Sequence, residues 1–283
     1  MSTSIEAATA SGPPAVEQPS KPPKRRRSRE LGPHRGLIYL GRAVLFVAII
    51  GLWEIASRQE WIDPLLFGSP SGVVEAFFDY VPSEEARASM QATFSAIAIS
   101  FVVGSLTGTA AGLALGLSKT LDGIVGPFLA PLNSVPRIAL APLFIAWFGL
   151  TMTAKVVLAV SIVFFILAEN ARSAVRSVDH DLMTMGRVVG LKRRAILWKV
   201  VLPSAVPTIF AGLRLTFTYS LLGVIASEMI AATSGLGQDI VLYSSSYQIN
   251  TVFAILVVLM IVAVVVNAIF TQVENRLLIW QKV

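Results

Sequence analysis

Long apolar stretches with very few charges follow one another along most of this chain, and short polar segments separate them. A helix needs about 20 predominantly apolar residues to cross the hydrocarbon core of a bilayer. Stretches that approach or exceed this length each predict one transmembrane helix: 37–56, 91–117, 124–150, 154–167 (extending toward 174), 204–232 and 251–270. We therefore expect an all-α polytopic membrane protein with six transmembrane helices.

The composition agrees with a membrane protein and excludes several kinds of site. Hydrophobic residues make up 54% of the 283 residues and charged residues 14%, whereas a soluble globular chain carries about 25% charged residues. Because the sequence has no cysteine, it excludes disulfides, thiolate nucleophiles, iron–sulfur clusters and cysteine-based zinc sites. His34 and His180 lie outside the apolar stretches, and we assign them no metal. No cofactor is expected.

The N-terminal segment 1–36 is rich in proline, serine and alanine, and it carries consecutive basic residues at 24–27. Such a segment cannot bury enough apolar area to offset the entropy of ordering it. We expect a disordered basic tail ahead of a transmembrane domain at 37–283. The basic cluster is expected to contact anionic membrane lipid. Nucleic-acid binding is the alternative, but membrane topology explains the net charge of +6 better.

The basic residues are distributed unevenly between the two sides that six spans would create. Most of the 23 lysines and arginines lie in the N-terminal tail, in segment 172–199 or near the C-terminus, all on one predicted side. Cytoplasmic loops of membrane proteins carry an excess of lysine and arginine. We therefore expect a multi-pass protein of the inner (plasma) membrane with both termini in the cytoplasm.

Glycine recurs at every fourth position of the second apolar stretch. The residues concerned are Gly104, Gly108, Gly112 and Gly116. Small residues at this spacing form a helix face that a neighbouring helix can approach closely. We interpret these glycines as a helix-packing face.

The third apolar stretch is interrupted by Pro127, Pro131, Pro136 and Pro142. A stretch with this many prolines cannot form one straight helix. Broken backbone at membrane depth is tolerated where it is buried in protein or lines a wet cavity. We therefore expect this stretch to border a translocation pathway, with Asn133 and Arg137 as candidate pathway residues.

Glu228 is the acid that stands out within the fifth apolar stretch. A carboxylate at the bilayer centre costs about 2.5–3.5 kcal/mol on insertion scales, so an apolar residue would insert more easily. Glu228 is interpreted either as a gate or pathway contact facing the bundle interior, or as an interfacial residue capped by Ser227 or Thr233.

The segment 181–203 differs from its surroundings because it is amphipathic and basic. Apolar or small residues at helical spacing predict a first short helix, and Gly190 offers a stop because glycine readily adopts positive φ. A second helical run, 193–201, is expected to end at Leu202 and Pro203, where proline is tolerated in the first turn of the next helix. Two short helices of this kind predict a docking element for a soluble partner.

The sequence lacks the residue patterns that are typical of nucleotide-binding and catalytic sites. There is no glycine loop followed by Lys-Ser or Lys-Thr to hold phosphates, and no Ser–His–Asp set or spaced carboxylate pair at membrane depth. We expect a protein that is not an enzyme and that takes its energy from another subunit.

Several short motifs occur together, in order and at matching spacing. They are Pro136 with Ala141-Pro-Leu143 and Trp147-Phe-Gly149, Gly190 followed by Val200-Val-Leu-Pro203, Gly212-Leu-Arg214, Ala226-Ser-Glu228-Met229, and Gly235-Leu-Gly237. Over about residues 40–281 the chain resembles the inner-membrane permeases of type I ABC importers, in the branch that serves sulfonates, taurine and nitrate.

This resemblance implies a complex of two permease copies as a homodimer, two ATP-binding subunits and an extracytoplasmic solute-binding protein, which transports by alternating access. It also implies an ATPase-coupling loop at about 177–203. The loop residues concerned are Asp181, Thr184, Met185, Gly186, Gly190, Lys192, Arg193, Arg194, Leu202 and Pro203. The family's loop usually begins Glu-Ala-Ala, where this chain has Thr-Met-Gly. Asp179 and Asp181 lie just upstream and could serve the helix N-terminus instead.

The main alternative is a stand-alone ion-coupled secondary transporter. Such a protein would carry charged or ion-coordinating residues at mid-span in two matching halves, and the sequence shows no such halves. A membrane-embedded enzyme would need catalytic groups that are missing. In importers of this class the solute-binding protein largely selects the solute, so the sequence leaves the solute open. Arg137 would favour an anion in transit.

Overall fold

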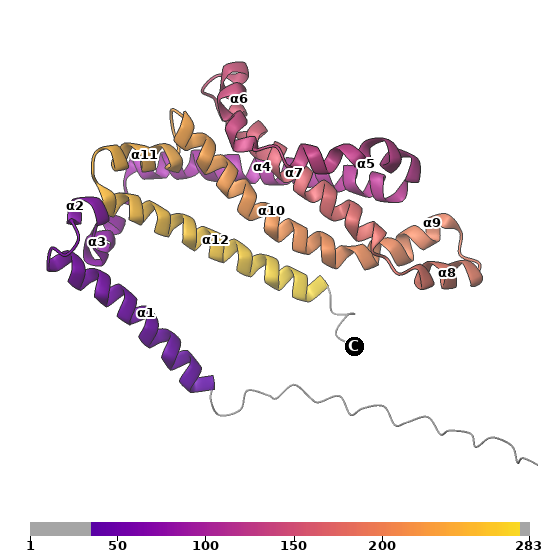
Figure 1. The fold of residues 1–283 in the computed structure, drawn as a ribbon, viewed down its shortest axis with the longest axis horizontal. Helices are drawn as coiled ribbons and strands as arrows, with labels where there is room; N and C mark the ends of the chain where they lie inside the picture. The colour runs from indigo at the N-terminus through magenta and orange to yellow at the C-terminus, as the bar shows by residue number, and fades with distance from the viewer. Residues whose placement is uncertain (1–34, 278–283) are drawn as a thin grey trace, which may run out of the picture. The chain divides into compact units, whose positions relative to one another are not determined.

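The computed structural model describes residues 35–277, so the tail expected at 1–36 lies almost entirely outside the described part. Every element in the described part is helical, as expected (Figure 1). The elements are α1 (Arg35–Arg58), α2 (Pro64–Phe67), α3 (Pro70–Tyr80), α4 (Glu84–Leu117), α5 (Lys119–Asn133), η1 (Arg137–Leu140), α6 (Ala141–Phe148), α7 (Met152–Arg176), α8 (His180–Val188), α9 (Arg193–Ile196), η2 (Leu197–Val201), α10 (Leu202–Ile230), α11 (Leu236–Ser245) and α12 (Ile249–Leu277). The chain divides into one unit that ends at Ile49 and a second that begins at Ile50. The second unit contains the helical bundle described below.

Among the described residues, five helices are long and apolar enough to cross a membrane: α1, α4, α7, the continuous η2–α10 helix (Leu197–Ile230) and α12. The sixth expected span is a bent pair of helices, Lys119–Asn133 and Arg137–Phe148, which meet at 84°. Pro127 and Pro131 lie inside α5, and the bend follows α5. The stretch rich in proline therefore forms two helices with a sharp bend between them, as its sequence predicts.

Two spans are longer than the apolar pattern predicts, because polar residues extend their ends. α4 begins at Glu84, since the Ser83 hydroxyl caps it by accepting a hydrogen bond from the backbone N–H of Ala86 at 3.0 Å. Acidic residues in its first turn also suit the positive end of the helix dipole. α7 continues to Arg176, where its last turns carry arginines that pair with α5.

The centre of the bundle is formed by α4, α7 and α10, with α7 packed against both of the others. The glycines spaced by four on α4 face α7. A Cβ added at Gly108 would lie 2.6 Å from the carbonyl oxygen of Phe164, and one at Gly112 would come closer still to that of Ala168. These approaches bring two helix backbones into direct contact, which glycine alone allows.

Hydrogen bonds between side chains join α10 to its other neighbours. The hydroxyls of Ser100 on α4 and Ser220 on α10 lie 2.8 Å apart in the buried interface. Arg214 on α10 forms an ion pair with Glu274 on α12. Polar contacts of this kind hold transmembrane helices together in lipid, where the hydrophobic effect gives little driving force for helix association.

At the end of the bundle that holds α2 and α3, α11 lies near α12 and the start of α4 (Figure 1). The Tyr80 hydroxyl of α3 donates a hydrogen bond of 2.5 Å to Asp239 of α11. Burial and the adjacent Asp239 carboxylate raise the pKa of Tyr80 well above its ordinary value. This bond anchors the short helices to the bundle.

Candidate functional site

The segment predicted as a coupling loop forms short helices at the end of the bundle opposite α2, α3 and α11 (Figure 1). α8 begins after Asp179, whose carboxylate accepts a hydrogen bond from the backbone N–H of Asp181 at 2.8 Å. Asp181 lies in the first turn of α8, where a negative charge is favourable. Gly190 follows α8 with a φ of 81°, a conformation that glycine adopts without Cβ strain.

The second half of this segment differs from the sequence prediction, because its helix does not end at Leu202 and Pro203. α9 continues through the π-helical turn η2 directly into α10. The backbone N–H of Leu202 donates to the carbonyl of Leu197, five residues earlier. Pro203 lies in the first turn of α10. A proline ring clashes with the carbonyl four residues before it, and the wider π turn relieves this clash.

One face of the segment is buried against the end of α7. Ile196 and Val201 belong to a buried cluster with Val175 and Val178. Gly186 is also buried, and a Cβ added to it would lie 3.4 Å from the side chain of Ile196, an ordinary contact distance. The segment is therefore packed on the bundle through buried side chains of α9 and η2.

The segment also exposes large apolar side chains, on α8 and the residue after it and on η2, which is the start of the candidate span Leu197–Ile230. We call this group of side chains the docking face, and it consists of Met185, Val188, Val189 and Trp198. Val188 is 82% exposed and Trp198 is 69% exposed. Exposed apolar side chains that are grouped in this way mark interaction sites.

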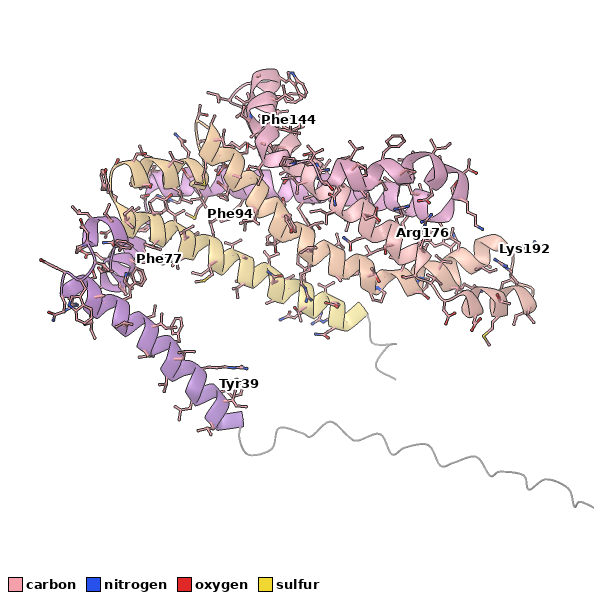
Figure 2. All side chains as sticks on the ribbon, viewed as in Figure 1. Tyr39, Phe77, Phe94, Phe144, Arg176 and Lys192 are labelled. Atoms are coloured by element: carbon pink, nitrogen blue, oxygen red, sulfur yellow. The ribbon has the colours of Figure 1, made fainter. Side chains whose placement is uncertain are left out.

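Basic and polar residues surround the docking face. The exposed cations among them are Arg187, Lys192 and Lys199. Figure 2 places Lys192 at the tip of the connection between α8 and α9. Thr184 is exposed and Leu202 is half-buried. The side chains of Arg193 and Arg194 lie outside the described part of the chain.

The bend in the third span positions Arg137, which is 9% exposed. Its guanidinium donates hydrogen bonds to the carbonyl oxygen of Leu132 at 2.5 Å and to Asn133 Oδ1 at 3.3 Å. Its central carbon also lies 4.2 Å from the centre of the Phe165 ring on α7. The sequence-predicted pathway residues Asn133 and Arg137 are thus brought together at the end of α5.

A cavity of about 290 Å³ lies beside this arginine. Its lining residues come from the bend, α7 and α10: Asn133, Val135, Arg137, Ile138, Ile162, Ile166 and Tyr219. The wall is mainly apolar, and the guanidinium, an amide and a phenol supply its polar groups. We call it the Arg137 cavity.

Glu228 lies inside the bundle near the end of α10 and is 1% exposed. Lys155 of α7 forms an ion pair with it, with Nζ 3.0 Å from Oε1. The Thr93 hydroxyl of α4 lies 3.0 and 2.9 Å from the two carboxylate oxygens, and the backbone N–H of Gly237 donates to Oε2 at 2.9 Å. This Lys155–Glu228 cluster joins α4, α7 and α10 to the start of α11.

The loop before α11 wraps closely around the same carboxylate. Lys155 also donates to the carbonyl oxygen of Ser234 at 2.5 Å, and the backbone N–H of Leu236 donates to Thr93 Oγ1 at 2.8 Å. Gly235 has a φ of 127°, and a Cβ there would overlap the Glu228 carboxylate. The glycine pair of this loop therefore allows the backbone to approach the buried charge.

Glu228 faces the bundle interior, as the first sequence interpretation expects, and its role as a gate or pathway contact stays a prediction. Its partners are Lys155, Thr93 and Gly237 rather than Ser227 or Thr233, and it is not among the residues that line the Arg137 cavity. Sequence reasoning missed Lys155 altogether. A lone lysine in one apolar stretch and a lone glutamate in another are the signal that predicts such a pair.

A second group of charges lies where α5 packs against α7. Asp122, in the first turn of α5, is buried and pairs with Arg172 and Arg176. Arg172 also pairs with Glu169 at 3.1 Å. Arg176 points toward α5 in Figure 2. This cluster, which the sequence analysis did not predict, attaches the first half of the broken span to α7.

Comparison with known proteins identifies the family. Residues 100–279 match the family described as binding-protein-dependent transport system inner membrane component. The chain is 36% identical to SsuC of Escherichia coli (strain K12), a permease named for aliphatic sulfonates transport, over 68% of this chain and 73% of SsuC. It is 30% identical to the taurine transport system permease protein TauC of the same organism, over 86% of this chain and 90% of TauC.

A solved structure has a similar fold. The MetNI methionine ABC transporter in an inward-facing conformation superposes with a TM-score of 0.61 at 19% identity, over 68% of this chain and 95% of that chain. The family match contains the docking face, the Arg137 cavity and the Lys155–Glu228 pair. These similarities rule out the stand-alone secondary transporter that the sequence left open. The chain therefore belongs to the family of binding-protein-dependent transport system inner membrane components and is a permease of an ABC importer.

Proposed function

We propose that this permease receives force from separate ATP-binding subunits through the docking face and uses it to alternate access to a small solute. The observation that carries the proposal is the group of exposed apolar side chains on α8 and η2, above all Trp198. Tryptophan is enriched among the residues that dominate interface energetics. The buried inner face of the same segment supports rigid transmission of movement into α7 and α10.

The docking face is proposed to lie in the cytoplasm. Basic residues gather at its end of the bundle, including Arg172, Arg176 and the exposed cations around the docking face. Acidic residues gather at the opposite end, where Glu75, Asp79 and Glu85 line one cavity. This asymmetry supports the positive-inside orientation, with both termini cytoplasmic.

The proposed assembly contains two copies of this permease, two ATP-binding subunits and a solute-binding protein. ATP hydrolysis takes place on the ATP-binding subunits. The solute-binding protein delivers its cargo at the end of the bundle formed by α2, α3 and α11. Membership of a family named for binding-protein dependence supports this division of labour.

The solute is proposed to be a small anion such as an aliphatic sulfonate. The names of SsuC and TauC, which refer to aliphatic sulfonates and to taurine, support this substrate class. Both names denote small organic molecules with a sulfonate group.

The docking face can be tested with a matched pair of tryptophans. Trp198 and Trp61 are each 69% exposed, but Trp61 lies at the opposite end of the bundle, between α1 and α2. Truncation of an interface tryptophan costs about 2 kcal/mol or more, which is about thirtyfold in affinity. Trp198→Ala is therefore expected to lose co-purification with the ATP-binding subunits and solute-stimulated ATPase activity, whereas Trp61→Ala retains both.

The same protein samples show whether a variant has lost docking or has misfolded. Each variant is purified in detergent, and its thermal unfolding is compared with that of the wild type before the subunits are mixed. Full co-purification and stimulated ATPase activity of Trp198→Ala would refute the docking proposal. Equal loss in both variants would refute it as well, since the effect would then not be specific to the docking face.

A further inference from the structure

Among the residues that the structure describes, Arg137 is a buried cation that no acidic side chain pairs with. Among the described residues, two cationic side chains are buried: Lys155 at 6% exposure and Arg137 at 9%. Lys155 has Glu228 as its partner, whereas the described carboxylates form ion pairs only with other cations and none with Arg137. A buried charge without an opposite charge lowers the stability of the folded protein. The presence of Arg137 in this position therefore indicates a role other than stabilising the fold.

The contacts of Arg137 hold its position without neutralising its charge. The carbonyl of Leu132 and the amide oxygen of Asn133 are neutral acceptors. The Phe165 ring attracts the cation through its quadrupole. A guanidinium carries more N–H groups than these two hydrogen bonds use, in a planar fork that suits oxyanions. The side chain is therefore oriented in advance and still has donors to offer.

The space beside the guanidinium fits a small amphipathic guest. The Arg137 cavity has a volume of about 290 Å³, close to the smallest ligand pockets, which start at about 300 Å³. Val135, Ile138, Ile162 and Ile166 supply an apolar wall, and Asn133 and Tyr219 add an amide and a phenol. One cation in a mainly apolar pocket matches a small monoanion with a short aliphatic tail.

The location of the Arg137 cavity also suits a site that the solute occupies while it crosses the permease. The cavity lies at the break between α5 and η1, and its other walls are α7 and α10. α10 is continuous with η2 and therefore with the docking face. Movement of the docking face would be passed along α10 to Tyr219, in the wall of the cavity.

We propose that the Arg137 cavity binds the anionic group of a small aliphatic anion, with Arg137 as its counter-charge and the isoleucines around its tail. The proposal rests on the function proposed above and deepens it, because it places discrimination for charge inside the permease. Asn133 is a positioning residue, since it fixes the guanidinium through its amide oxygen. Arg137 is the residue that touches the anion.

The test uses the purified full chain in detergent with ethanesulfonate as the probe and ethyl methyl sulfone as its uncharged isostere. Ionic strength is matched with sodium gluconate, and binding is read from the shift in thermal unfolding across a concentration series. Ethanesulfonate is expected to stabilise the wild type and the sulfone is not. Loss of a charge-assisted hydrogen bond lowers affinity about ten- to a hundredfold. Arg137→Met is expected to show this loss, and Arg137→Lys to retain part of the affinity because it keeps the charge.

A matched control removes another arginine from the same bundle. Arg214→Met deletes a guanidinium of α10 that has its own carboxylate partner, Glu274. This variant is expected to bind ethanesulfonate as the wild type does. Equal responses of the wild type to the two probes would overturn the proposal, and so would an unchanged response in Arg137→Met.

Separate readouts distinguish this inference from the proposed function. Trp198→Ala is expected to lose coupling to the ATP-binding subunits while keeping the wild-type response to ethanesulfonate. If Trp198→Ala couples normally while the response depends on Arg137, the docking proposal fails and the cavity site stands. If Trp198→Ala loses coupling and Arg137→Met still binds ethanesulfonate, the cavity site fails and docking stands.

Discussion

Replacement of Lys155 by methionine is expected to destabilise the bundle by about 3–5 kcal/mol, because it leaves the Glu228 carboxylate buried without a counter-charge. The carboxylate is 1% exposed, so water cannot replace the lost ammonium group. Methionine fills a similar volume with an apolar side chain, which limits the effect of a cavity. The Ser234 carbonyl also loses its hydrogen bond from Lys155.

The size of this effect follows from what remains around Glu228. The Thr93 hydroxyl and the Gly237 N–H still face the carboxylate, so the charge keeps neutral donors but no cation. The double variant Lys155→Met with Glu228→Gln removes both charges and keeps an amide oxygen that can accept from Gly237. We expect the double variant to lose about 1–2 kcal/mol, since what remains is imperfect hydrogen bonding of neutral groups.

The assay is denaturant unfolding of the purified full chain in detergent, with both single variants and the double variant forming a double-mutant cycle. Arg58→Met is the control, because Arg58 pairs with Glu54 at an exposed position and its removal is expected to produce no measurable change. A double variant that is as unstable as Lys155→Met, or a Lys155→Met variant as stable as the wild type, would refute the reasoning.

Three further variants test other parts of the structure. Gly112→Ala is expected to lose about 1–3 kcal/mol of stability in thermal unfolding, because its Cβ meets the backbone of α7. Gly123→Ala is the control, since there is open space around Gly123, and it should be neutral or stabilising in the same assay. Gly186→Ala should stabilise α8 by up to about 1 kcal/mol, since the Cβ has room and alanine favours helix; lower thermal stability would contradict this. Tyr80→Phe should cost about 1–3 kcal/mol at neutral pH because Asp239 loses a buried donor. The pKa of Tyr80 is raised above 10 in the folded protein, so the stability that its hydroxyl contributes should persist below pH 10 and be lost as the pH rises further. When unfolding is measured as a function of pH, Tyr80→Phe should therefore lose less stability at alkaline pH than the wild type.

Part of the candidate site could be predicted from the sequence, because its signals are local. Gly190 and Asp179 mark the end and the start of α8, and the structure has a helix between them. The continuous π turn before Pro203 could not be predicted in this way. Its helix is maintained by burial of Ile196 and Val201 against α7, and the sequence around the proline contains no information about that contact.

The apolar pattern by itself determined the membrane class, the expected spans and the break in the third span. This is because hydrocarbon requires every span to satisfy its own backbone and because proline removes a donor wherever it occurs. Short motifs were enough to indicate the family. Tertiary structure alone decided the partners of the charges. Glu228 meets Lys155, 73 residues away, while none of the described acidic side chains pairs with Arg137. Charge pairing depends on which helix faces are in contact, and periodicity along one helix does not contain that information.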